Sequence, residues 1–303
     1  MIKLPIFLKK DIIFNNSSSN KYSMNDKINN FYLKLMEETL LSGFHPYSYS
    51  SLNYRKKSLV KNIIKYFIHK LINKKDQHLV LKTTLSAKVI ENGQYGQYTN
   101  AFTMVGRKRL LNIKALIKKI IDNKVEGDLI EAGIWRGGLL IYMRACLFAF
   151  SENRKVFGAD SFQGLPPIDE IKYPDDKILK SVLQDQAEDN LSISKKNVIE
   201  NLKKFNFHDS NTILLEGWFE NTLKDKRIKK LSLLRIDGDL YKSTYEALDI
   251  LYHKVSKGGF IIIDDYGLGS QSCKNAVDDF REKNNIKSKI IKIDWTGVYW
   301  QKS

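Results

Sequence analysis

The sequence predicts an α/β protein with a mostly parallel sheet that is covered by helices on both faces. From Gly127 onwards, short strand-like runs alternate with helical patterns, which is the order expected of repeated strand–helix units. These runs are solidly apolar rather than alternating, as in strands buried on both sides. With 303 residues, of which 43% are hydrophobic, the chain is long enough and apolar enough to build such a core.

Five strands, four helices and a terminal hairpin are expected in this region. The strands are predicted at Asp128–Ala132, Val156–Asp160, Thr212–Glu216, Leu231–Asp237 and Gly259–Asp264. The helices are predicted at Leu139–Ser151, Lys195–Phe205, Ser243–Val255 and Cys273–Asn284. The segments Ser288–Asp294 and Gly297–Gln301 are predicted to form the hairpin.

The N-terminal third has a different texture and is predicted to form a basic, mainly helical extension over residues 1–100. Helices are expected at Asn30–Leu41 and at Leu110–Asp122, the second with an apolar stripe at helical spacing. Between the first helix and residue 100, a turn-rich stretch and a glycine-containing loop are expected. The domain that carries the chemistry is therefore predicted to span residues 101–303.

Positive charge is concentrated in the N-terminal part of the chain. Residues 1–127 hold 23 Lys and Arg against 8 Asp and Glu, whereas residues 128–303 hold 27 against 26. The densest run, Arg55–Lys75, has the spacing of a basic amphipathic helix. Such a helix either packs on the core with a solvated charged face, or attracts an anionic membrane surface or a polyanionic acceptor. No zinc-finger or RNA-binding signature accompanies the charge, so a nucleic-acid partner is not expected.

The remaining composition favours a cytoplasmic protein. The longest apolar runs are far too short to cross a bilayer, and the first residues lack the pattern of a signal peptide. Cys146 and Cys273 match neither a zinc site nor a redox pair, and they are expected to be buried thiols in a reducing compartment.

Glycines and an acidic residue follow the first two predicted strands. After Glu131 the chain reads Gly133-Ile-Trp135-Arg136-Gly137-Gly138, and glycines at the start of a helix allow a ligand to approach the backbone. The spacing departs from the dinucleotide-binding fingerprint, which argues against a nicotinamide-dependent oxidoreductase. Asp160 ends the second strand, where an acidic residue commonly binds a ribose diol. Together these residues indicate a nucleoside-binding site.

Two acidic pairs follow the fourth and fifth predicted strands. Asp237 and Asp239 end the first of these strands, and Asp264 and Asp265 end the second. Residues i and i+2 of an extended segment point the same way, so carboxylates from adjacent strands can converge on one site. Unpaired carboxylates repel one another there, and a divalent cation would relieve the repulsion. An all-oxygen ligand set favours Mg²⁺ or Ca²⁺ over zinc, although both pairs could also be exposed caps.

The chain also resembles a known family. It is similar to the macrocin O-methyltransferase (TylF-like) family through the motifs EAGIWRGG, ADSFQGLPP, EGWFENTL, LRIDGDLYKSTYEAL, LYHKVSKGGFIIIDDYG and the ending VYW. The resemblance runs almost continuously from Phe102 to Trp300, with a weaker match at FYLKLMEETL. Residues 42–95 match poorly, and Ala132 stands where the family often has Thr. The family implies a class I methyltransferase (Rossmann-like) fold of seven strands, the last antiparallel.

The resemblance also implies the cofactors and the role of each site residue. S-adenosylmethionine and Mg²⁺ would be the cofactors. Asp160 and Ser161 would bind the ribose of the cofactor, and Gly217 and Trp218 would lie near its adenine. Its methionine part would be held by Glu131, Gly133, Trp135, Arg136 and Gly137. Asp237 would also contact the cofactor. Asp237, Asp264 and Asp265 match the metal ligands, and Asp239 matches the general base.

The activity that the resemblance implies is methylation of a sugar hydroxyl in a glycoconjugate, polysaccharide or natural product. The basic N-terminal part adds the expectation of an anionic acceptor, such as a nucleotide- or lipid-linked sugar, and a homo-oligomer is expected. Two alternatives remain: a catechol-type O-methyltransferase acting on an aromatic diol, and a non-catalytic protein that binds membranes or polyanions.

Overall fold

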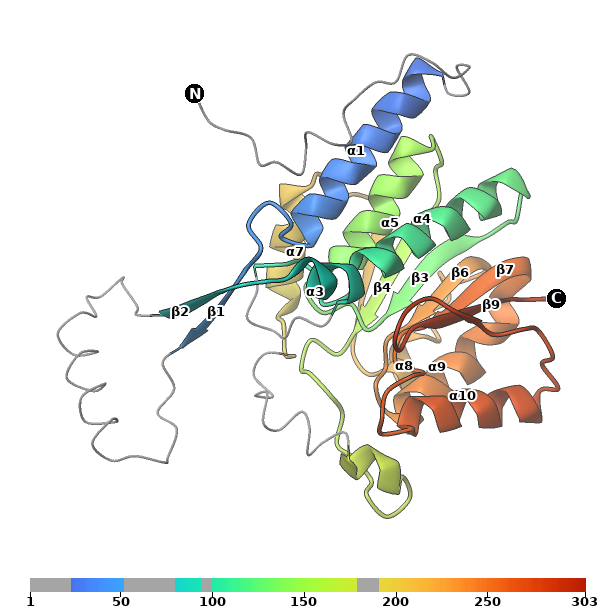
Figure 1. The fold of residues 1–303 in the computed structure, drawn as a ribbon. Coiled ribbons are helices and arrows are strands. Elements are labelled where there is room, and N and C mark those ends of the chain that lie inside the picture. Colours follow the sequence, from blue (N-terminus) through green and yellow to red (C-terminus); the bar gives the residue numbers. More distant parts are fainter. Residues whose placement is uncertain (1–22, 52–79, 94–99, 179–190) are drawn as a thin grey trace, which may run out of the picture.

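The computed structural model describes residues 23–51, 80–93, 100–178 and 191–303 (Figure 1). The predicted basic helix at Arg55–Lys75 lies outside the described residues. Within them, none of the helices is both long enough and apolar enough to cross a membrane.

A seven-stranded sheet forms the centre of the molecule, and its strands lie in the order β5-β4-β3-β6-β7-β9-β8. β9 is antiparallel to both of its neighbours, whereas β3 to β7 are mutually parallel. The strands are β3 (Asp128–Ala132), β4 (Val156–Asp160), β5 (Thr212–Glu216), β6 (Leu231–Ile236), β7 (Val255–Ile263), β8 (Ile291–Lys292) and β9 (Val298–Gln301). The five predicted strands, the terminal hairpin and the antiparallel last strand are confirmed.

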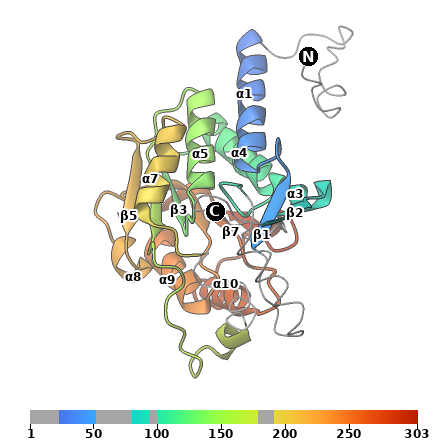
Figure 2. The same ribbon diagram turned by 90° about the vertical axis from the view of Figure 1, so that its left-hand side faces the viewer.

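Two layers of helices cover the sheet, one on each face (Figure 2). One layer contains α4 (Arg107–Asp122), α5 (Gly138–Ala149) and α7 (Lys195–Lys204). The other contains α8 (Phe219–Thr222), α9 (Tyr241–Leu251) and α10 (Ser272–Lys283). A short 3-10 turn, η3 (Tyr252–Lys254), joins α9 to β7. Apart from α8 and η3, these helices lie within a few residues of the predicted positions.

The apolar strands are buried on both sides, which explains their continuous hydrophobic runs. Successive residues of a strand point to opposite faces. Leu129 therefore lies in the core that contains residues of α4 and α5, whereas its neighbour Ile130 lies in the core that contains residues of α9 and α10. The same alternation along β6 places Leu233 in the first core and Leu234 in the second.

Before residue 100, the described part of the chain contains two helices and two strands. α1 (Met24–Leu40) begins at Ser23, where Ser23 and Asp26 form a reciprocal capping box, and it buries Leu33 and Leu40 against α5. β1 (Tyr47–Ser51) and β2 (Val80–Thr84) pair antiparallel in a sheet of their own, and α3 (Ala87–Asn92) follows. α1 was predicted, whereas β1, β2 and α3 were not.

Candidate active site

The ends of the five parallel strands β3 to β7 meet at one edge of the sheet, and their pairing continues past the last strand residue. The backbone N–H groups of the next residues donate to neighbouring strands: Gly133 to Ala159 O (2.8 Å), Gly217 to Asp160 O (2.9 Å), Asp237 to Ala132 O (2.8 Å) and Asp264 to Ile236 O (3.0 Å). These bonds hold the predicted site residues in register. The strand order reverses between β3 and β6, because β4 and β5 lie on one side of β3 and β6 and β7 lie on the other. Open α/β sheets bind their ligands at such a reversal.

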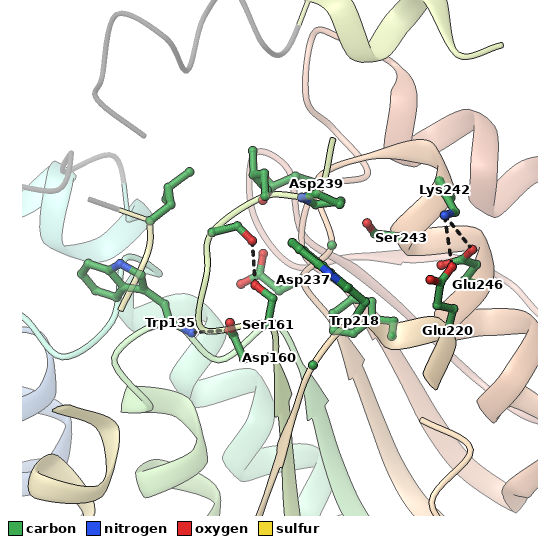
Figure 3. A pocket seen from close by; sticks show the side chains of 18 of the residues that line it. Trp135, Asp160, Ser161, Trp218, Glu220, Asp237, Asp239, Lys242, Ser243 and Glu246 are labelled. Carbon is green, nitrogen blue, oxygen red and sulfur yellow. Dashed lines mark hydrogen bonds and ion pairs between the residues drawn. The ribbon is translucent and has the colours of Figure 1, made fainter. Parts of the chain in front are cut away.

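A cavity of about 320 Å³ lies at this edge. Eight of the predicted site residues line it, namely Gly133, Trp135, Asp160, Ser161, Gly217, Trp218, Asp237 and Asp239. Its walls also include Met104, Leu165, Pro166 and Pro167. Figure 3 shows Trp135 and Asp160 at one end of the cavity, with Trp218, Asp237 and Asp239 nearer its centre. The structure thus brings together residues that are spread over more than 100 positions of the chain.

The predicted glycine loop forms the turn between β3 and α5. Gly133 and Gly137 both have left-handed backbone conformations, with φ of 90° and 79°, and Gly137 is the N-cap of α5. Trp135, between them, has φ of 48° and lines the cavity. Arg136 lies elsewhere: its guanidinium packs over the Trp135 ring at 4.2 Å and donates to Ala101 O at 2.8 Å.

Asp160 ties this turn to the end of β4. Its Oδ2 accepts the N–H groups of Ile134 (2.9 Å) and Trp135 (3.2 Å), and its Oδ1 accepts the N–H of Phe162 (2.8 Å). Burial raises the pKa of Asp160, and these three bonds act in the opposite direction. The adjacent Ser161 hydroxyl donates to Gly164 O at 2.8 Å. Asp160 therefore fixes the shape of the loop that it adjoins.

A group of three carboxylates lies at the ends of β6 and β7. Asp237, Asp239 and Asp265 each present one oxygen, and these atoms lie within 4.8 Å of one another. Asp239 has a left-handed φ of 54°, and its N–H donates to Asp265 Oδ2 at 3.3 Å. Oxygen donors at this spacing suit a hard divalent cation.

Asp264 lies beside the three-carboxylate group but is held by two buried arginines. Arg109 on α4 and Arg235 on β6 both bond its Oδ2 atom, the first at 2.5 Å. Its Oδ1 atom is buried and has no hydrogen-bond partner. Burial acts to raise the pKa of Asp264, but the two guanidinium groups outweigh it and hold the pKa below its usual range.

Arg235 links Glu131, near the end of β3, to the acidic residues Asp237 and Asp264 that follow β6 and β7. Its guanidinium bonds Glu131 Oε1 at 2.5 Å and Asp237 Oδ2 at 2.8 Å, in addition to Asp264. Glu131 is 2% exposed and does not reach the cavity surface, and its Oε2 atom is buried without a partner. One guanidinium is therefore shared by three carboxylates.

The site holds more buried negative charge than its arginines neutralise. Burial, assisted by Asp237, Asp264 and Asp160, raises the pKa of Glu131 to about 8 in spite of Arg235. Burial beside Asp237 and Asp264 raises the pKa of Asp239 to about 7, and the pKa of Asp265 is raised as well. Cationic ligands would stabilise such a site, because each removes part of this repulsion.

Several cavity residues were not among the predicted ones. Lys242, on the first turn of α9, forms ion pairs with Glu220 (3.2 Å) and Glu246 (3.5 Å) at the end of the cavity away from Trp135 (Figure 3). Glu220 lies in the motif EGWFENTL, and Lys242 and Glu246 lie in LYKSTYEAL. Glu220 and Lys242 are 22 residues apart in the chain, and no sequence pattern predicts that they form an ion pair.

Comparisons with known proteins agree with this geometry. Residues 29–302 match the family described as Macrocin-O-methyltransferase (TylF). The chain is 44% identical over 205 residues to demethyldecarbamoylnovobiocin O-methyltransferase of Streptomyces niveus, covering 67% of this chain and 77% of that protein. It is 35% identical over 248 residues to mycinamicin III 3''-O-methyltransferase of Micromonospora griseorubida, covering 81% and 96%.

A solved structure with the same architecture is that of the O-methyltransferase NovP. The two structures superpose with a TM-score of 0.74 at 36% sequence identity, over 91% of this chain and 99% of that chain. The seven-stranded fold, the cavity at the strand ends and these relatives lead to one conclusion. The chain belongs to the macrocin O-methyltransferase (TylF) family and is an S-adenosylmethionine-dependent O-methyltransferase.

Proposed function

We propose that this enzyme methylates a hydroxyl group on the sugar of a glycosylated natural product or a related glycoconjugate, and that it depends on Mg²⁺. The observation that carries the proposal is the single cavity in which the predicted cofactor residues and the acidic residues Asp237 and Asp239 lie together. The names of the relatives support the acceptor class. One is named for mycinamicin III, and a further relative, from Streptomyces olivaceus and 39% identical over 202 residues, is named for a rhamnosyl tetracenomycin.

The cofactor would lie along the cavity from the glycine loop to Trp218. Gly133 and Trp135 would contact its methionine part, and Asp160 would bind its ribose. The Asp160 oxygens already accept backbone N–H groups, but a carboxylate oxygen can accept a further hydrogen bond. The resemblance assigns Glu131 to the methionine part as well. Its Oε2 atom is buried without a partner and does not line the cavity, so contact with the ammonium group would require the Glu131 side chain to turn toward the cavity.

The acidic residues fit a divalent cation. We assign Asp237, Asp264 and Asp265 as its ligands, as the family resemblance implies. Among the described residues, the carboxylates whose oxygens lie within 4.8 Å of one another are Asp237, Asp239 and Asp265, so Asp264 stands outside this group and would join the cation through its buried Oδ1, which lacks a donor. When bound, the cation would supply positive charge that lowers the pKa of a nearby acceptor hydroxyl. Asp239 lies within the same 4.8 Å group and would remain available to the acceptor.

Asp239 would act as the general base. In the reaction a bond forms between the acceptor oxygen and the methyl carbon, the bond from that carbon to sulfur breaks, and S-adenosylhomocysteine leaves. The hydroxyl proton would pass to an Asp239 oxygen. In the protein without metal and cofactor, burial and the neighbouring Asp237 and Asp264 raise the pKa of Asp239 to about 7. A bound cation would lower this pKa, because it removes part of the repulsion.

Calorimetry and an acceptor panel test this proposal. The protein would first be titrated with S-adenosylmethionine, and micromolar binding is expected. It would then be incubated with demethyldecarbamoylnovobiocin, mycinamicin III and a simple catechol, each with Mg²⁺ or with EDTA, and methylated products would be identified by mass spectrometry. Methylation of a glycoside with Mg²⁺ alone is expected. Methylation of only the catechol, or equal turnover in EDTA, would contradict the acceptor class or the metal requirement respectively.

A further inference from the structure

We propose that Arg109 is a positioning residue that orients Asp264 for the divalent cation. This inference rests on the proposed function, because it takes Asp264 as a metal ligand. Arg109 is 7% exposed and lies on α4, outside the strand-end motifs, and its side chain reaches Asp264 across 155 positions of sequence.

The first argument is geometric. Arg109 Nη1 bonds Asp264 Oδ2 at 2.5 Å, and Arg235 bonds the same oxygen. With Oδ2 occupied by two guanidinium groups, Oδ1 is the one oxygen of Asp264 without a donor. The arginines therefore favour a single orientation of the carboxylate, in which only Oδ1 is available to a cation.

The second argument is that Arg109 is itself fixed from behind. Its Nε atom donates to Asp294 Oδ2 at 2.8 Å, and its Nη2 atom bonds Asp294 Oδ1 (3.2 Å) and the Thr296 hydroxyl. Asp294 and Thr296 are 5% and 2% exposed and lie between β8 and β9. A planar guanidinium held at both edges can impose direction on a carboxylate, which a flexible ammonium group cannot do.

The third argument is that charge and position predict opposite effects on metal binding. Arg109 is a cation close to a cation site, so its charge alone would weaken metal binding. If Arg109 acted only through charge, its removal would strengthen binding. If it orients a ligand, its removal weakens binding, and loss of such supporting groups typically costs about 10–100-fold in metal affinity.

The test is a titration of the 303-residue protein with Mn²⁺, followed by electron paramagnetic resonance, with no acceptor present. Arg109→Lys keeps the charge but cannot bridge both partners, and we expect about 10–100-fold weaker Mn²⁺ binding. Arg109→Met should also weaken binding, although it removes a positive charge. Wild-type affinity in Arg109→Lys, or tighter binding in Arg109→Met, would overturn the inference.

Arg107→Lys is the matched control. Arg107 lies on the same helix but pairs with Glu91 (2.7 Å) and Glu38 (3.0 Å), and neither is a site residue. Its Mn²⁺ affinity should stay within about twofold of wild type. Equal losses in both lysine variants would mean that α4 is merely loosened, and this would also overturn the inference.

Further measurements separate this inference from the proposed function and from misfolding. Each variant is titrated with S-adenosylhomocysteine, and affinity within about threefold of wild type shows an intact cofactor site. If Arg109→Lys does not fold, the inference is tested with Thr296→Val instead, which removes one hydrogen-bond partner of Arg109. This variant should bind Mn²⁺ about two- to fivefold more weakly. Unchanged binding would count against the inference. Wild-type Mn²⁺ affinity in Asp264→Asn would contradict the proposed ligand set itself.

Discussion

The carbonyl oxygen of Asp237 lies only 2.0 Å from the position that a Cβ atom on Gly133 would occupy. The two residues follow the adjacent strands β3 and β6, and the Asp237 N–H donates to Ala132 O beside them. Gly133 also has φ of 90°, a conformation that other residues rarely adopt. This close approach places the glycine loop between β3 and α5 directly against Asp237, the first residue of the three-carboxylate group.

Gly133→Ala should therefore damage both stability and cofactor binding. The added methyl group cannot be accommodated without moving the Asp237 backbone, and the left-handed backbone alone costs about 1–3 kcal/mol for a residue with a side chain. We expect a lower urea midpoint and at least about tenfold weaker binding of S-adenosylmethionine by calorimetry. Gly269→Ala is the control, since no atom lies within 4 Å of its Cβ position. Wild-type cofactor affinity in Gly133→Ala would show that the loop does not need this contact.

Asp160→Ala should lower the affinity for the cofactor more than the loss of one hydrogen bond to the cofactor would. The change removes the acceptor for three backbone N–H groups that shape the loop as well as the proposed ribose contact. Unsatisfied groups of this kind cost about 1–3 kcal/mol each, so we expect at least about tenfold weaker binding. Asp169→Ala, which removes an exposed carboxylate bonded to one backbone N–H, should bind normally. Similar affinities for the two variants would contradict the role of Asp160.

Asp239→Asn should separate binding from turnover. An amide cannot accept the acceptor proton, and loss of a general base typically lowers the rate about 10²–10⁴-fold. The amide is nearly the same size, so affinity for S-adenosylmethionine should stay within about threefold. Single-turnover kinetics with a saturating glycoside acceptor would measure the chemical step. A rate within a few-fold of wild type would exclude Asp239 as the base.

Stability of the metal-free and cofactor-free protein should fall as the pH rises from about 5 to 8. The pKa of Glu131 is raised from 4.5 to about 8 in the folded protein, so between these values the folded state holds a proton that the unfolded state has lost. Unfolding then releases a proton, and stability decreases by at most about 1.4 kcal/mol per pH unit for one group. Above pH 8 the contribution levels off.

Urea unfolding in EDTA at several pH values would measure this slope. Glu131→Gln should reduce the slope, because the amide does not titrate, and the part that remains belongs to other buried carboxylates such as Asp239. Saturating S-adenosylmethionine should also reduce the slope if its ammonium group binds near Glu131. A slope that is unchanged in Glu131→Gln would assign the pH dependence to other groups.

Much of the fold follows from local patterns in the sequence. Solid apolar runs such as residues 260–263 of β7 and helical stripes such as that of α4 predict their elements within a few residues. The acids and glycines of the site are visible because parallel strands bring their carboxyl ends to one edge. β1 and β2 are different: within the described residues they pair only with each other, and the Tyr and Ser residues of β1 resemble those of a turn-rich loop.

The arginines of the site could not be assigned from the sequence, because their partners are remote. Arg109 appears as one of several basic residues on α4, and nothing near it in the chain indicates Asp264 or Asp294. Arg235 gives a partial signal, since a charged residue within the apolar strand LSLLRI requires buried counter-charges. The sequence does not reveal that three carboxylates share it, because this depends on side-chain directions at the ends of β3, β6 and β7.

The packing of α1 has a consequence for the order of events during synthesis. Glu37 accepts a hydrogen bond from the Tyr142 hydroxyl, 105 residues further along the chain, and Leu33 and Leu40 are fully covered in the same core. At about 5–20 residues per second, the ribosome needs about 5–20 seconds to make the intervening chain. During that interval α5 has not been made, and the apolar face of α1 stays exposed. We expect the nascent chain to be prone to aggregation until α5 covers this face.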